Sequence, residues 1–177
     1  PCSPGWVVKL QNQATAAARG AYEELVAALP AEPVVGMDET PTKEANGKAW
    51  LWTAAAERFT AFAVRPTREG TAVSALLGES FRGVVTCDRA KMYWQVPQLQ
   101  WCWAHLKRDF QALIDGGDPQ AKRLGYDLCC STRRLFGHWA DYRANTISRA
   151  ALRRRMGPVR RRIEQLLRRG ALSGNRR

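Results

Sequence analysis

The sequence of 177 residues predicts a mixed α/β fold that is preceded by one helix and followed by an all-helical extension. Three observations lead to this prediction. Apolar residues recur at helical spacing before Pro30, short apolar runs bounded by turn residues follow up to residue 104, and helical spacing returns after residue 119. We therefore expect a helical segment at 1–33, an α/β core at 34–118 and a helical extension at 119–177.

The first segment is expected to form a helix over residues 3–29. Ser3 followed by Pro4 is typical of an N-cap residue before a proline at the first helical position. Pro30 and Pro33 end the helix because proline lacks the backbone N–H that a helix needs. Between Pro4 and Pro30, apolar and small residues recur at helical spacing, at Leu10, Ala14, Ala17, Ala21, Leu25 and Ala28.

The α/β core is expected to begin with a three-stranded antiparallel meander at residues 34–38, 49–56 and 59–64. Asn46-Gly47 predicts a tight hairpin turn between the first two strands. A short helix over residues 70–78, a strand at 83–88 and a strand at 99–104 complete the core. The last strand is expected to lead into a helix from about His105 to Ile114.

The extension carries helical spacing over residues 120–170, and breaks are expected near Asn145 and at Gly157-Pro158. Its last part is amphipathic. The predicted apolar side holds Val159, Ile163, Leu166 and Leu167, and the opposite side holds Arg160, Arg161, Arg162, Arg168 and Arg169.

The net charge of +12 is concentrated in the extension. From Arg143 to Arg177 there are twelve arginines, no lysine and one acid, Glu164, whereas residues 1–142 hold sixteen basic and fifteen acidic side chains. A concentrated field of arginine attracts phosphate backbones. A solvated helix face is the alternative explanation, but the near absence of acids favours a nucleic acid over a membrane surface.

The cysteines and the hydropathy pattern indicate a cytoplasmic, nucleoid-associated protein. The five cysteines are odd in number and irregularly spaced, and Cys129 and Cys130 are adjacent, so we expect reduced thiols. The sequence contains no run of about 18 apolar residues, so no membrane span is expected. No secretory pattern precedes the first helix. Because the chain begins with Pro1 rather than methionine, we expect a fragment.

Two aspartates stand where short apolar strands are predicted to end. Asp38 follows Val34–Met37, and Asp88 follows Gly83–Cys87. If these strands are neighbours in one sheet, their carboxylates meet at one edge and offer the hard oxygen ligands that Mg²⁺ or Mn²⁺ prefers. An aspartate after a strand can also begin a loop or cap a helix. Glu39 is expected to be a neighbour and not a ligand, because successive strand residues point to opposite faces.

The chain resembles the central region of transposases of the insertion-sequence 66 type. The resemblance runs from about residue 5 to the C-terminus. It rests on four motifs in series, which are Asp38-Glu39-Thr40, Asn46-Gly47-Lys48-Ala49-Trp50-Leu51-Trp52, Cys87-Asp88-Arg89-Ala90-Lys91-Met92-Tyr93 and Cys102-Trp103-Ala104-His105-Leu106-Lys107-Arg108-Asp109-Phe110.

The resemblance implies a ribonuclease-H-like core and a catalytic site of the type with three acidic residues. It assigns Asp38 and Asp88 as the first two acids, which hold Mg²⁺ or Mn²⁺ for DNA cleavage and strand transfer. It also implies a multimer on two transposon ends. The third acid of the family is a glutamate in an Asn- and Arg-rich motif, and no such motif precedes Arg177. We therefore expect little or no transposition by this chain alone.

Several other residues are candidates for contact with DNA. Trp50, Trp52, Trp101 and Trp103 are expected to be mostly packing residues. Cys102 and His105 form half of a zinc pattern, but a full site needs two more ligands, so we expect either core packing or a role near the active site. The candidate DNA-binding residues are Arg89, Lys91, His105, Lys107, Arg108, Arg153, Arg154, Arg160 and Arg161.

Three functions are compatible with these patterns. The first is a transposase catalytic-core fragment that binds transposon ends and target DNA. The second is a non-enzymatic DNA-binding remnant of a decayed transposon, which the arginine-rich tail and the missing glutamate favour. The third is a metal-dependent nuclease that uses another acid as its third ligand. No phosphate-binding glycine loop and no nucleophilic serine motif supports a nucleotide-hydrolysing or acyl-transfer enzyme.

Overall fold

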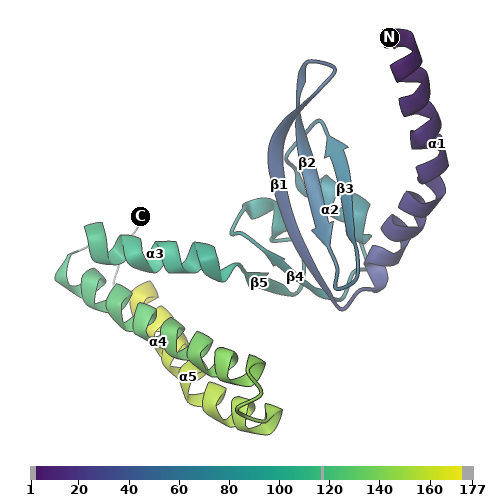
Figure 1. The fold of residues 1–177 in the computed structure, drawn as a ribbon. Coiled ribbons are helices and arrows are strands. Elements are labelled where there is room, and N and C mark those ends of the chain that lie inside the picture. The colour runs from purple at the N-terminus through teal and green to yellow at the C-terminus, as the bar shows by residue number, and fades with distance from the viewer. Residues whose placement is uncertain (1–2, 117, 173–177) are drawn as a thin grey trace. The chain divides into compact units, whose positions relative to one another are not determined.

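The computed structural model describes residues 3–116 and 118–172. The chain divides into two compact units, Pro1–Cys102 and Trp103–Arg177. The first unit holds a mixed α/β fold, and the second is all-helical (Figure 1). Arg176 and Arg177, which belong to the predicted arginine-rich tail, lie outside the described residues.

The first unit is built on a five-stranded sheet in the order β3-β2-β1-β4-β5. The predicted meander is confirmed, because β1 pairs with β2 and β2 with β3 in antiparallel fashion. β4 lies parallel to β1 on the other side, and β5 lies parallel to β4. The strands are β1 (Val34–Glu44), β2 (Gly47–Ala55), β3 (Thr60–Arg65), β4 (Val84–Cys87) and β5 (Leu99–Trp101).

The hairpin between β1 and β2 turns one residue earlier than the Asn46-Gly47 signal predicts. Glu44 and Gly47 form the last pair of the ladder, so Ala45 and Asn46 are the two turn residues. Both adopt positive φ, at 47° and 63°. This is the backbone twist that a two-residue hairpin turn requires, and asparagine tolerates it well. β1 is therefore much longer than predicted, and Asp38 lies within it rather than at its end.

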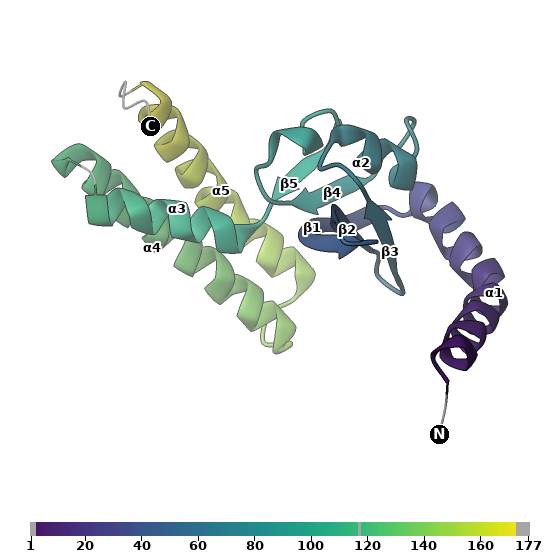
Figure 2. The same cartoon turned by 90° about the horizontal axis from the view of Figure 1, so that it is seen from above.

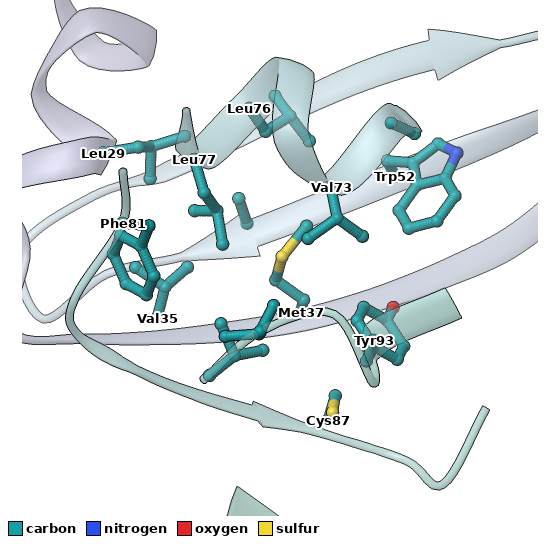
Figure 3. Close-up of a cluster of buried hydrophobic side chains, with 14 of the residues drawn as sticks. Leu29, Val35, Met37, Trp52, Val73, Leu76, Leu77, Phe81, Cys87 and Tyr93 are labelled. Carbon is teal, nitrogen blue, oxygen red and sulfur yellow. The ribbon is translucent and has the colours of Figure 1, made fainter. Parts of the chain in front are cut away.

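One face of the sheet packs against the helix α2 (Gly70–Leu77), and this face forms the core of the first unit (Figure 3). Along β1, Val35 and Met37 are buried, Gly36 between them is half-buried, and Val34 and Asp38 on either side are exposed. This alternation follows from the two-residue period of a strand. The core therefore fixes which β1 side chains point outward. The largest fully buried side chains of this cluster are Trp52, Tyr93, Leu29, Leu76, Leu77, Val35, Val73 and Val85.

The N-terminal helix α1 (Pro4–Ala28) is confirmed, and Ser3 caps it by accepting a hydrogen bond from the Trp6 N–H at 3.3 Å. α1 has no buried residue. It contacts the sheet through Tyr22, whose hydroxyl donates to the Phe62 carbonyl at 2.9 Å. A short helical turn, η1 (Leu29–Ala31), follows and buries Leu29 completely.

The connection from β5 to the next helix differs from the prediction. β5 has only three residues, and the helix α3 (Trp103–Gly116) begins at Trp103, two residues before His105. The Cys102 N–H donates to the Cys87 carbonyl at 2.7 Å, which extends the strand pairing by one hydrogen bond. Only Cys102 therefore separates the end of β5 from the start of α3.

The second unit packs α3 against α4 (Pro119–Arg143), and α4 against α5 (Arg149–Leu172) (Figure 2). Phe110, Leu128 and Leu166, one from each helix, form its buried cluster. Gly125 permits the close crossing of α3 and α4, because a Cβ atom there would lie 2.6 Å from the Phe110 carbonyl oxygen. The boundary that the sequence suggests between residues 118 and 119 falls between α3 and α4, inside this unit.

The predicted break near Asn145 is confirmed, but the predicted break at Gly157-Pro158 is wrong. Asn145 adopts a φ of 56° between α4 and α5, whereas α5 runs uninterrupted through Pro158. Leu152, Val159 and Leu166 are buried on both sides of the proline, so packing outweighs its local penalty. Pro158 itself is exposed. Because proline has no N–H, the carbonyl of Arg154, four residues earlier, lacks its helical donor.

Replacing Pro158 with alanine is therefore expected to stabilise the helical unit by roughly 1–3 kcal/mol. The substitution restores one helical hydrogen bond and removes the steric conflict of the proline ring. Thermal unfolding followed by circular dichroism measures the effect. As a control, Gln165→Ala on the exposed side of the same helix should change stability by less than about 0.5 kcal/mol. An unchanged or lower melting temperature for Pro158→Ala would contradict the proposed cost of the proline.

Within the part of the chain that the structure describes, no helix is both long enough and apolar enough to cross a membrane. The four cysteines of this part, Cys87, Cys102, Cys129 and Cys130, are free thiols, as predicted.

Candidate metal and DNA-binding site

Asp38 lies within β1, and Asp88 directly follows β4, the parallel strand beside β1. The pairing of β1 with β4 runs through Val34 with Val84 and Gly36 with Thr86. Continued by two residues, this register aligns Asp38 with Asp88. Asp38 alternates with the buried Met37 and therefore points away from the α2 core. Asp88 lies one residue beyond the end of β4, and its carboxylate lies near Arg68, the partner of Glu39. The register thus brings the two positions to the same end of the β1–β4 pairing, and the meeting of their carboxylates stays a prediction.

The two carboxylates differ in their surroundings. Asp38 is exposed, and its Oδ1 atom accepts a hydrogen bond only from the adjacent Glu39 N–H at 3.0 Å among the described contacts. Asp88 is less open, with 26% of its side chain exposed. Its Oδ1 atom accepts from the Ala90 N–H at 2.8 Å, and its Oδ2 atom lies 4.0 Å from Nη2 of Arg68. Asp88 is therefore the more firmly oriented of the pair.

Glu39 points the other way, into the core, as the alternation along β1 predicts. Only 1% of its side chain is exposed. The Tyr93 hydroxyl donates to Oε2, and Arg68 contacts Oε1 through Nε at 2.7 Å and Nη2 at 2.5 Å. A buried carboxylate is tolerated because these donors replace water. Glu39 is thus a structural anion and lies on the opposite face from Asp38.

The ionisation of this cluster follows from its burial and its hydrogen bonds. Burial, followed by the hydrogen bond to Glu39, raises the pKa of Tyr93 well above its usual range, so the hydroxyl keeps its proton and donates. The hydrogen bond to Glu39 raises the pKa of Arg68, whereas burial lowers it and the charge of Asp88 raises it further. Arg68 is therefore a permanent cation between Glu39 and Asp88.

Cys87, the residue before Asp88, belongs to the core and not to the site. It is 2% exposed and lies in the same cluster as Met37 and Tyr93 (Figure 3). Burial, with a contribution from the charge of Asp88, raises the pKa of the Cys87 thiol to about 11. A neutral, buried thiol is neither a nucleophile nor a metal ligand at neutral pH.

The donor set of Asp38 and Asp88 fits a magnesium ion. Among the described residues, no group of three or more His, Cys, Asp or Glu side chains is placed to hold a metal. Mg²⁺, however, commonly keeps several waters and is bound by one or two carboxylates together with substrate phosphates. The two aspartates can therefore supply the protein's oxygen ligands, whereas both oxygens of Glu39 already have partners in Arg68 and Tyr93.

The basic candidates beside the acidic motifs fall in different units. Arg89 and Lys91 are exposed and follow Asp88 directly in the first unit. Lys107 and Arg108 are exposed on α3 in the second unit, where His105 is half-buried. The structure thus leaves the four charged side chains accessible to phosphate. Cys102 ends the first unit, and His105 belongs to the second.

The helix α5 carries three rows of side chains spaced by seven residues. Residues seven apart on a helix differ by only about 20° in direction, so each row follows one side of α5. The first row is the buried set Leu152, Val159 and Leu166. The second row is Arg155, Arg162 and Arg169, which pair with acids of α4. The third is double and consists of Arg153 with Arg160 and Arg154 with Arg161.

Asp127 of α4 organises the second row. Its side chain is 14% exposed, and its carboxylate lies 3.1 Å from Arg162 and 3.8 Å from Arg169. Arg123 approaches the same carboxylate at 3.4 Å from the preceding turn of α4. Arg155 pairs in the same way with Asp141, at 3.2 Å. The second row therefore holds α5 against α4. The sequence pattern alone did not separate these arginines from arginines that contact DNA.

The third row consists of the four arginines that the sequence assigns to DNA, namely Arg153, Arg154, Arg160 and Arg161. All four are exposed, and none has an acidic partner within the described ranges 3–116 and 118–172. We call these four residues the open arginine row. Uncompensated guanidinium groups along one side of a helix form the electrostatic pattern that attracts a phosphate backbone.

The tryptophans follow the prediction with one exception. Trp52 is fully buried, and Trp50 packs under Arg68, whose guanidinium carbon lies 5.1 Å from the ring centroid. Trp103 packs edge-to-face on Phe136 in the helical unit. The packing role predicted for Trp101 is wrong, because this side chain is 41% exposed. β5 is an edge strand, in which Trp101 pairs with Cys87 of β4.

Arg68 and Tyr93 are the site residues that the sequence did not reveal. They come from the loop after β3 and from the short helix η2 (Lys91–Tyr93), 29 and 54 residues beyond Glu39. No sequence motif links either residue to Glu39. The one available signal was the presence of two adjacent acids in a strand, of which one had to face the core and find a partner.

Comparison with protein families gives one match, to the family described as "Transposase IS66 family", over residues 1–172. This match spans both units and includes Asp38, Asp88 and the open arginine row. Comparison with curated proteins and with solved structures gives no match.

Proposed function

Because the chain belongs to the IS66 family of transposases, we propose that it is a catalytic region in which Asp38 and Asp88 bind a divalent cation for DNA cleavage and strand transfer. The proposal includes a ribonuclease-H-like fold for the first unit. The mixed sheet, with three antiparallel strands and two parallel ones, supports that fold. The proposed partner is DNA, both transposon ends and target, held by a multimer of the enzyme.

The observation that carries the proposal is the parallel register of β1 and β4. Its last pair is Gly36 with Thr86, so Asp38 and Asp88, which lie 50 positions apart in the sequence, each follow two residues later. One aspartate near a strand end is common, but two at the same end of a parallel strand pair support a shared cation site. The chemistry proposed for a Mg²⁺ or Mn²⁺ ion here is activation of the attacking oxygen and stabilisation of the leaving oxygen.

The residues of the chain would divide the remaining work. The hydrogen bond from the Ala90 N–H holds one oxygen of Asp88 and leaves the other available to a ligand. Arg89 and Lys91 lie directly after Asp88 and supply positive charge beside a bound phosphate. The open arginine row would bind the DNA backbone without regard to sequence.

Binding of Mn²⁺ to this chain tests the metal site directly. Titration followed by the electron paramagnetic resonance signal of free Mn²⁺ should reveal one site, and Asp38→Asn or Asp88→Asn should weaken it at least about tenfold. Glu57→Gln, an exposed carboxylate in a turn of the same unit, is the matched control and should bind as the unchanged chain does. Equal binding by all variants would refute the assignment of Asp38 and Asp88.

A non-enzymatic DNA-binding protein is the second candidate, and the open arginine row favours it. That row requires no metal, so duplex binding should be as strong in EDTA as in Mg²⁺ and should weaken steeply with salt. Such binding together with no Mn²⁺ site would favour this candidate over the enzyme. DNA binding that does not change with salt would exclude the open arginine row as the DNA contact in both candidate functions.

A further inference from the structure

Glu39, Tyr93 and Arg68 form a polar network that ends beside Asp88. Tyr93 and Arg68 occupy different oxygens of the buried Glu39 carboxylate. The Trp50 ring lies against the other side of the guanidinium. Arg68 is thereby held on two sides, although 43% of its side chain is exposed. An exposed arginine without such contacts would sample many conformations.

A single nitrogen of Arg68 relates the two carboxylates. Its Nη2 atom lies 2.5 Å from Oε1 of Glu39 and 4.0 Å from Oδ2 of Asp88. The first distance is a close ion pair. The second is too long for a hydrogen bond, which needs about 2.7–3.2 Å between the heavy atoms. Glu39 therefore keeps the guanidinium near Asp88 without letting it close on the Asp88 oxygen.

We propose that Glu39 and Arg68 are positioning residues that keep the Asp88 carboxylate available to a divalent cation. The inference rests on the proposed function, since it gives Asp88 the role of a metal ligand. Glu39 holds Arg68 back, and Arg68 sets the orientation of Asp88 from a fixed position. The adjacent acids of β1 thus have different roles. Asp38 is a metal ligand, and Glu39 holds the Arg68 guanidinium beside Asp88.

The network makes opposite predictions for its two charged members. In Glu39→Gln the guanidinium loses its anionic partner and is free to pair directly with Asp88, so it competes with the metal. Mn²⁺ affinity should then fall roughly tenfold. In Arg68→Gln the competing cation is absent and Glu39 keeps its charge nearby, so Mn²⁺ affinity should rise several-fold. The double variant should return close to the affinity of the unchanged chain, because both effects act through the same pair.

The experiment is this double-mutant cycle, measured by Mn²⁺ titration of the whole chain, with Arg68→Lys as the conservative variant that keeps the charge. Circular dichroism and thermal unfolding accompany every variant. A purely structural network would lower the melting temperature in all variants and leave Mn²⁺ affinity unchanged or lower it in each. That result would overturn the inference. If Glu39→Gln does not fold, Arg68→Gln alone decides: unchanged or weaker Mn²⁺ binding rejects the proposal.

The outcome also separates this inference from the proposed function. Absence of an Mn²⁺ site in the unchanged chain would remove the metal-binding function and the positioning role together. An Mn²⁺ site that depends on Asp88, but does not respond in opposite directions to Glu39→Gln and Arg68→Gln, would reject the positioning role and leave the metal-binding function intact.

Discussion

Asparagine in place of Asp38 or Asp88 is expected to lower transposition by roughly 10³-fold or more in an assay with the complete transposase. The amide keeps the shape of the side chain but loses the negative charge that holds a divalent cation. The readout is the frequency with which a marked element moves from a donor plasmid to a target. Strand cleavage in vitro with Mn²⁺ should fall in parallel.

These substitutions should leave the fold intact, which makes the result specific. Asp38 is exposed and contacts only the neighbouring backbone N–H among the described hydrogen bonds. At position 88 an asparagine oxygen can still accept the hydrogen bond from Ala90. Melting temperatures within about 2 °C of the unchanged protein are expected, with Glu57→Gln as the control that keeps activity. Transposition at more than a tenth of the original frequency in either variant would disprove the catalytic assignment.

Replacement of the open arginine row by glutamine is expected to weaken duplex binding by on the order of 10²–10³-fold at about 0.1 M salt. Four phosphate contacts would be lost, so the slope of log affinity against log salt should become shallower by about 3 to 4. Glutamine is a good helix former, so α5 should persist. Fluorescence anisotropy with a labelled duplex at several salt concentrations measures both quantities.

The paired arginines of the same helix provide the matched control. Glutamine at Arg155, Arg162 and Arg169 also removes three positive charges, but these charges are already compensated by Asp141 and Asp127. This variant should lose thermal stability and change the salt slope by less than about 1. Equal losses of DNA affinity per removed charge in the triple and the quadruple variant would show that binding depends on total charge and not on the open arginine row.

Much of the first unit could be predicted from the sequence because its signals are local. Alternating apolar residues, the turn at Asn46 and the short apolar runs before Asp38 and Asp88 each report on a few neighbouring residues. The length of β1 could not be predicted. Residues 39–44 are polar except for Pro41, and they become strand because β2 pairs with them through to Gly47. Strand pairing supplies hydrogen bonds that the local sequence does not announce.

The candidate site divides in the same way. The opposite directions of Asp38 and Glu39 follow from strand alternation, which the sequence carries, although Asp38 lies within β1 and not at its end. The partners of Glu39 depend on a loop and a short helix that the fold brings together from far along the chain. Likewise, the composition of α5 predicted a basic helix, but only the contacts with Asp127 and Asp141 separate the arginines that hold helices together from those that face outward.

The seven-residue spacing on α5 has a consequence for how this helix can change in length. Inserting or deleting one residue turns everything beyond that point by about 100°. A deletion between Leu152 and Val159 would bring Arg160 into the buried place of Val159, and the helix could no longer pack. Adding or removing seven residues rotates the remainder by only about 20°. Relatives of this chain should therefore vary the reach of α5 in whole steps of two turns, each about 10.5 Å long.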